Sequence, residues 1–175
     1  MKFLKQYRVA VLSIGAIVLS LLLLLIPGFA HFEKIGDDYQ YLANGYQFFF
    51  NLKAHNGEVA SKFGTGNVKA GIAIIVLSGL ALIMFCLTKF SSFFVLMGGL
   101  MNLTNSILFF SMEASANKVY PPHDDWTTCG WVTYFIGALL VIAAGYALYK
   151  AVLMMRDEIK HPAQPKGPSY NYLKK

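Results

Sequence analysis

Four long apolar runs divide the chain, and none of them contains Asp, Glu, Lys or Arg. They cover residues 9–29, 70–88, 91–112 and 131–149. At a rise of about 1.5 Å per residue, each run is long enough to cross a hydrocarbon core of about 30 Å. Because lipid offers the backbone no hydrogen-bonding partner, such runs must form helices. We therefore predict an all-α membrane protein built as a four-transmembrane-helix bundle.

Basic residues set the expected orientation of these spans. Lys2, Lys5 and Arg8 precede the first run, and further Lys and Arg residues follow the last. Because basic residues gather on the cytosolic side, we predict a multi-pass protein of the cell membrane with both termini in the cytosol. The predicted segments are a cytosolic tail (1–8), first span (9–29), first outer loop (30–69), second span (70–88), cytosolic turn (89–92), third span (93–112), second outer loop (113–130), fourth span (131–153) and a disordered cytosolic tail (154–175).

The formal net charge of +6 follows the same asymmetry. A basic chain often binds nucleic acid, but here the basic residues gather at the predicted inner face. We therefore exclude a nucleic-acid partner and expect attraction to anionic lipid. A cleaved signal peptide is the alternative for the first run, because Gly28-Phe29-Ala30 resembles a small-residue cleavage site. The run is, however, longer than the apolar region of about 7–15 residues in such peptides.

The first outer loop contains two Asn-Gly pairs, Asn44-Gly45 and Asn56-Gly57. Asn-Gly flanked by alternating apolar residues is the strongest short-range signal for a two-residue hairpin turn. Two such turns predict a small extracellular antiparallel β-meander with strands over residues 39–43, 46–55 and 58–63. An amphipathic helix over residues 39–53 is the alternative, because short apolar runs fit either structure. The turns place apolar side chains on one face, the candidate interaction surface, which comprises Tyr39, Tyr41, Tyr46, Phe48, Phe50 and Phe63.

Polar residues follow one face of the third run. Asn102, Asn105 and Ser106 recur at helical spacing, with Asn102 near the middle of the predicted span. This candidate polar intramembrane face can line a small pore, so a channel or transporter component is the second functional hypothesis. The same side chains can instead hydrogen-bond neighbouring helices, at about 0.6 kcal/mol per bond. Small residues on the other runs favour close helix packing and offer faces for self-association.

The stretch PPHDDWTTCGW, residues 121–131, combines side chains that bind metals with two tryptophans. Established metal motifs such as His-Glu-x-x-His and Cys-x-x-Cys are absent from the sequence. We predict that this stretch caps the fourth helix with a carboxylate and anchors it with Trp at headgroup depth. We accordingly predict no catalytic residue, no cofactor and no metal. The third hypothesis is an outward-facing metal-dependent enzyme that uses His31, His55, His123, Asp124 and Asp125.

The predicted outline resembles the claudin-type tetraspan proteins, which also have cytosolic ends and a long first outer loop with strands. Those proteins carry a Trp-Gly-Leu-Trp motif and two cysteines in that loop, whereas residues 30–69 here contain neither Trp nor Cys. The resemblance is one of outline and implies that an extracellular sheet contacts a partner. Our leading hypothesis is a non-enzymatic membrane protein that acts as an interaction, scaffold or accessory subunit through its aromatic-rich outer sheet. The expected partners are the lipid bilayer and either another protein or a second copy of the chain.

Overall fold

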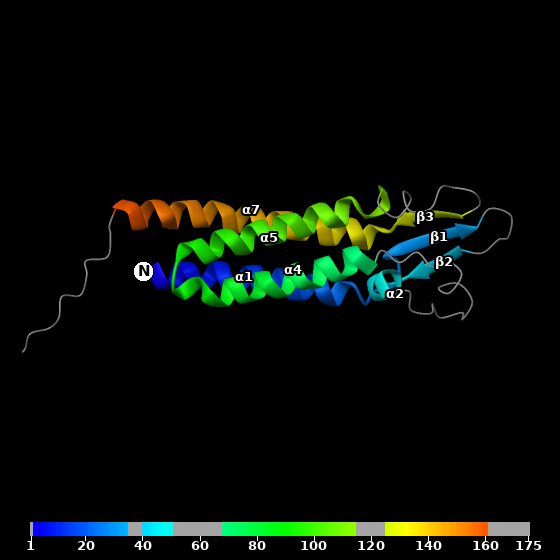
Figure 1. Cartoon of the computed structure of the whole chain (residues 1–175), viewed down its shortest axis with the longest axis horizontal. Helices are drawn as coiled ribbons and strands as arrows, with labels where there is room; N and C mark the ends of the chain where they lie inside the picture. Colours follow the sequence, from blue (N-terminus) through cyan, green and yellow to red (C-terminus); the bar gives the residue numbers. More distant parts are fainter. Residues whose placement is uncertain (1, 35–39, 51–67, 115–124, 161–175) are drawn as a thin grey trace, which may run out of the picture.

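The computed structural model describes residues 2–34, 40–50, 68–114 and 125–160. Long helices run side by side along the molecule, and a small sheet and a short helix lie at one end (Figure 1). The elements in chain order are α1 (Lys2–Leu23), β1 (Ala30–Lys34), β2 (Gln40–Ala43), α2 (Gly45–Phe50), α4 (Val68–Cys86), the 3-10 helix η1 (Leu87–Lys89), α5 (Ser92–Phe110), β3 (Asp125–Cys129) and α7 (Trp131–Lys160).

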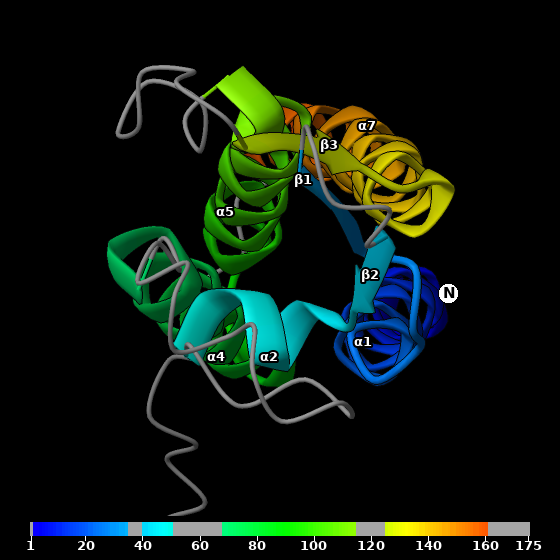
Figure 2. The ribbon, with the colours of Figure 1, turned by 90° about the vertical axis from the view of Figure 1, so that its right-hand side faces the viewer.

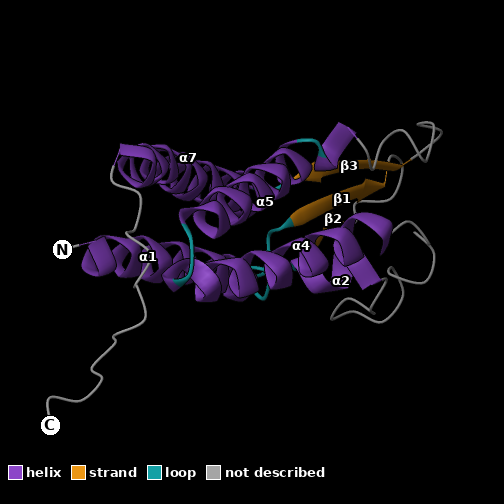
Figure 3. Ribbon diagram, turned by 60° about the vertical axis from the view of Figure 1, so that its left-hand side comes forward, coloured by secondary structure: helices purple, strands orange, loops and turns teal. Residues whose placement is uncertain are grey.

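The long helices α1, α4, α5 and α7 surround a common core (Figure 2). α5 contacts each of the other three, and α1 contacts α4 and α7. α1 begins and α7 ends at the same end of the molecule, where the turn between α4 and α5 also lies (Figure 3). The sheet and α2 occupy the opposite end. We call this opposite unit, formed by β1, β2, β3 and α2, the outer cap, because the basic residues of the sequence predict that this end faces outward.

Among the described residues, three helices are long and apolar enough to cross a membrane: Lys69–Lys89, Ser92–Phe110 and Trp131–Lys160. The apolar part of α1, Tyr7–Leu23, is shorter. A membrane-spanning helix needs about 20 apolar residues. The described helices therefore support a membrane protein with three candidate spans, and the predicted four-span fold class is corrected in this respect.

The first predicted span extends too far because α1 ends before Pro27. The amides of Leu25 and Ile26 each bond to the carbonyl three residues earlier, at 3.0 and 3.1 Å, as in a tightened last turn. Pro27 has no amide hydrogen with which to continue a helix. Gly28 then adopts φ +98°, a conformation that glycine reaches without steric cost. The chain thereby leaves α1 and enters β1.

The predicted β-meander in the first outer loop is wrong. Residues 46–55 were expected to form its middle strand, but Gly45–Phe50 form the helix α2. The observed three-stranded sheet has the order β2-β1-β3. In it β1 pairs antiparallel with β2, with Ala30 opposite Ala43, and with β3, with Ala30 opposite Cys129. The third predicted strand, residues 58–63, lies outside the described residues.

A capping box explains why the chain turns into a helix at Asn44-Gly45. Asn44 Oδ1 accepts a hydrogen bond from the Gln47 amide at 2.8 Å. Gln47 Oε1 accepts one from the Asn44 amide at 3.0 Å. These reciprocal bonds satisfy amides that the first turn of a helix leaves free. The Asn-Gly pair therefore begins a helix instead of closing a hairpin. The alternative prediction, an amphipathic helix over residues 39–53, agrees with the structure over Gly45–Phe50 but not over Gln40–Ala43, which form β2.

Glycines let the long helices approach closely. A Cβ atom at Gly99 would lie 3.0 Å from the side chain of Leu148, and one at Gly137 would lie 3.0 Å from the ring of Phe110. These contacts join α5 to α7 at two levels. Small residues at such points are typical of helix packing in membranes, where backbones approach without a hydrophobic driving force. The small residues at these two positions therefore serve helix packing within the molecule.

Candidate functional site

An aromatic cluster joins the outer cap to the ends of the helices. The ring of Phe29, which follows α1, lies 5.8 Å from that of Phe48 and 5.3 Å from that of Phe49, both on α2. It also lies 6.2 Å from the ring of Phe109 at the end of α5. These separations are typical of favourable ring pairs, each worth about 0.5–1.5 kcal/mol beyond burial. The cluster therefore fixes α2 against the helix ends.

Hydrogen bonds fix the cap at two further points. The Gly45 amide donates to the Leu24 carbonyl at 2.8 Å. The Phe29 carbonyl accepts from the Gly130 amide at 2.8 Å and from Thr133 Oγ1 at 2.8 Å. The first bond ties α2 to the end of α1, and the other two tie the start of β1 to the start of α7. The cap and the helices consequently form one packed unit.

The predicted interaction surface is divided by this packing. Phe48 is only 3% exposed and belongs to the core, so its ring is not available to a partner. Tyr46 and Phe50 are half-buried, and the Tyr46 hydroxyl donates to the Leu21 carbonyl at 3.2 Å. Tyr41 lies in β2, opposite Phe32 of β1. The last two predicted members, Tyr39 and Phe63, lie outside the described residues.

The predicted polar intramembrane face is brought together in the interior. Asn102, Asn105 and Ser106 are all 0% exposed. Asn105 Nδ2 donates to Ser78 Oγ at 3.0 Å, which joins α5 to α4. Ser106 Oγ donates to the Gly137 carbonyl at 3.0 Å, which joins α5 to α7. Two of the three residues therefore form hydrogen bonds between helices.

Asn102 differs from its neighbours on this face. Neither its Oδ1 nor its Nδ2 has a hydrogen-bond partner among the residues that the structure describes, and the same holds for Asn105 Oδ1 and Ser13 Oγ. A buried polar group without a partner costs about 1–3 kcal/mol. The interior between the helices thus contains polar groups that the described side chains leave unsatisfied.

Glu113 links the ends of α5 and α7 that lie nearest the sheet, a role that the sequence pattern does not predict. Its Oε2 accepts from the Cys129 amide at 3.1 Å and from the Tyr134 hydroxyl at 2.8 Å. Burial of the Cys129 thiol, with the negative charge of Glu113 as a smaller cause, raises its pKa from 9.0 to about 12. The thiol is therefore protonated at neutral pH and is a poor nucleophile.

The residues of the metal-enzyme hypothesis are mostly outside the described part of the chain. His55, His123 and Asp124 fall in the segments 51–67 and 115–124. His31 lies in β1 and Asp125 at the start of β3. Among the described residues, no group of three or more His, Cys, Asp or Glu side chains is placed to hold a metal ion.

No protein-family model matches this chain. No curated protein matches it either. The claudin-like outline predicted from the sequence is thus not accompanied by a family match, and function rests on the geometry described above.

Proposed function

We propose that this chain is a non-enzymatic integral membrane protein that serves as an interaction or accessory subunit and contacts its partner through the outer cap. The observation that carries the proposal is the attachment of the cap to the helix ends. The Phe29 carbonyl accepts bonds from the Gly130 amide and from Thr133 Oγ1, both at 2.8 Å, and the Phe29 ring packs on α2. A unit held in this way presents a constant surface at a constant height above the membrane.

Backbone pairing gives this surface a way to bind. Within the described residues, β2 and β3 each pair with β1 alone. An edge strand offers a row of amide and carbonyl groups to which another chain can add a strand. This differs from the contact predicted from the sequence, because Phe48 is enclosed in the core. Phe50, on the helix α2 that follows β2 in the chain, is half-buried and packs partly against the core.

The proposed orientation places the outer cap outside the cell and both termini in the cytosol. Support comes from the charges at the opposite end of the molecule, where Arg8 lies in the first part of α1, Lys89 ends η1 and Lys160 ends α7. Basic residues gather on the cytosolic side of membrane proteins. Labelling of an introduced cysteine in intact cells tests this orientation.

The cap contact is tested by affinity purification of the full chain from native membranes in mild detergent. Phe50→Ser removes the half-buried ring on α2, and we expect it to abolish co-purification of the partner; the melting temperature of each variant is measured alongside, so that loss of the partner is distinguished from unfolding. Phe90→Ser is the matched control, because Phe90 is 67% exposed at the opposite end and its replacement should leave the partner bound. Co-purification of no protein with the wild-type chain would refute the proposal, as would retention of the partner by Phe50→Ser.

A second candidate function is a small channel or transporter component, and Asn102 favours it. Its amide is buried in α5 without a partner among the described residues, and polar groups in a membrane interior can serve a path for water or a polar solute. Flux of small solutes through reconstituted vesicles is the test. Flux that is absent from the wild type, or unchanged by Asn102→Leu, would remove this candidate.

A further inference from the structure

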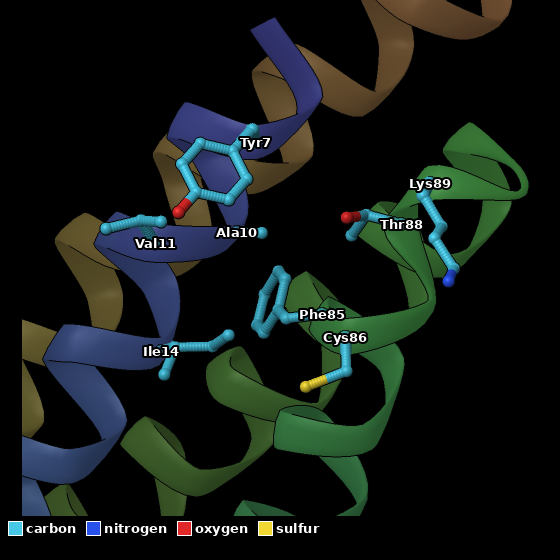
Figure 4. Close-up of a pocket in the computed structure, with 8 residues that line it drawn as sticks. All are labelled: Tyr7, Ala10, Val11, Ile14, Phe85, Cys86, Thr88 and Lys89. Carbon is cyan, nitrogen blue, oxygen red and sulfur yellow. The ribbon is translucent and has the colours of Figure 1, made fainter. Parts of the chain in front are cut away.

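An apolar cleft of about 330 Å³ opens between α1 and the end of α4 (Figure 4). This volume falls within the range of about 300–1,000 Å³ that is typical of ligand pockets. Figure 4 shows Phe85 and Cys86 turned toward α1, with Ile14 facing them. Its lining includes Tyr7, Ala10, Val11 and Ile14 on α1 and Phe85, Cys86 and Lys89 on α4 and η1.

The floor of this cleft is fixed by packing. Phe85 is 1% exposed, and its ring lies so close to Gly98 that a Cβ atom there would be 2.9 Å from it. Because the Phe85 ring packs against the backbone of α5 at Gly98, it is held at the floor of the cleft and does not fill it. Tyr7 and Val11 are exposed on the other wall. The cleft therefore opens on the outer surface of the helices, where lipid would lie.

The rim of the cleft carries a positive charge. Lys89 ends the candidate span Lys69–Lys89, and its Nζ lies 4.8 Å from the centre of the Phe90 ring. Within the part of the chain that the structure describes, Lys89 has no carboxylate partner. Glu158, which lies at the same end, accepts a hydrogen bond from Ser92 Oγ at 2.7 Å. An apolar cleft is thus bordered by a cation at the level where the apolar helix surface ends.

We propose that this cleft binds an anionic membrane phospholipid, with part of an acyl chain in the cleft and the phosphate at Lys89. The lining matches the acyl chain, and the ammonium group matches the phosphate. Exposed Arg8, adjacent to Tyr7 on α1, adds a second positive charge at this end. Basic pockets between membrane helices on the cytosolic side recognise anionic lipid head groups in this way. The inference is independent of the protein partner proposed above.

Cys86 provides a direct measure of occupancy, because it lines the cleft and is exposed. The full chain is placed as single copies in nanodiscs of phosphatidylcholine, with and without phosphatidylglycerol. Alkylation by neutral N-ethylmaleimide is followed at each cysteine by peptide mass spectrometry. Bound phosphatidylglycerol should slow alkylation of Cys86 about fivefold, the factor that corresponds to ~1 kcal/mol for one basic residue at an anionic surface.

Three variants separate the cleft from a general effect of surface charge. Lys89→Gln should remove the protection of Cys86, and Ala10→Leu, which fills the cleft from α1, should make alkylation independent of lipid composition. Lys150→Gln is the matched control and should retain the protection, because Lys150 lies over the rings of Tyr146 and Tyr149 and does not line the cleft.

Three results would overturn the proposal. The first is equal alkylation of wild-type Cys86 in both kinds of nanodisc, and the second is protection that survives Lys89→Gln. The third is protection that is absent from single-copy nanodiscs and appears only in vesicles at high protein density, which would identify a second copy of the chain as the occupant.

Discussion

Asn102→Leu measures what the buried amide on α5 contributes to the folded protein. The side chain is 0% exposed, and neither of its polar atoms has a partner among the described residues. Leu has a similar size, so the exchange removes two unsatisfied polar groups with little change in shape. Asn105→Leu is the matched variant, because Asn105 is equally buried on the same helix but donates to Ser78 Oγ at 3.0 Å.

The magnitude follows from the difference between these two positions. An unsatisfied buried polar group costs about 1–3 kcal/mol in a soluble protein. In a membrane the unfolded chain also finds polar partners, and a hydrogen bond between helices averages about 0.6 kcal/mol. Asn105→Leu loses such a bond and removes one unsatisfied oxygen, whereas Asn102→Leu loses no bond and removes two unsatisfied polar atoms. Because the packing change is similar at both positions, we expect Asn102→Leu to be the more stable variant by ~1–2 kcal/mol.

The assay is the free energy of unfolding in bicelles, measured by denaturing detergent titration and followed by the helical circular dichroism signal. Both variants and the wild type are compared under one condition, so that errors of extrapolation cancel. A free energy of unfolding that is lower for Asn102→Leu than for Asn105→Leu would contradict this expectation. That outcome would mean that Asn102 binds a polar partner in the folded protein, and it would favour the channel hypothesis.

Two other changes test particular contacts. Gly98→Ala should lower the melting temperature by an amount that corresponds to ~1–3 kcal/mol, because the added Cβ would meet the ring of Phe85 at 2.9 Å. Gly79→Ala is the control and should be neutral or stabilising, because no atom lies within 4 Å of its added Cβ. Equal effects at the two positions would contradict the packing of Phe85 on Gly98. Folding raises the pKa of Cys129 from 9.0 to about 12, so the folded state favours the protonated thiol. The stability gained from this preference is complete below about pH 9 and is lost as the pH rises toward 12. At pH 9, maleimide should therefore modify this thiol much more slowly in the folded protein than in the detergent-unfolded chain, and equal rates would disprove the shift.

The difference between prediction and structure in the first outer loop comes from one dipeptide. Asn44-Gly45 has the composition of a hairpin turn, and the same Asn three residues before Gln47 has the spacing of a capping box. The second signal is present in the sequence, and the hydrogen bonds at 2.8 and 3.0 Å show that it prevails. Burial decides between the two, because a helix over Gly45–Phe50 places Phe48 and Phe49 against Phe29.

The polar face of α5 shows how far helical spacing alone can predict a site. The spacing of Asn102, Asn105 and Ser106 predicts that they share one side of a helix, and all three are buried. It does not identify their partners, because Ser78 and the Gly137 carbonyl lie on other helices. Partners of this kind depend on the rotation and height of each helix relative to its neighbours.

By itself, the sequence determines that this chain contains long apolar helices, because a run without charged residues must satisfy its own backbone hydrogen bonds in lipid. The tertiary structure alone decides where those helices stop and what their ends contact. Glu113 reaches Cys129 and Tyr134, and β1 pairs with the distant segment Asp125–Cys129. The reason is physical: periodicity acts over neighbouring residues, whereas these contacts join residues far apart in the chain and form only when the helices pack.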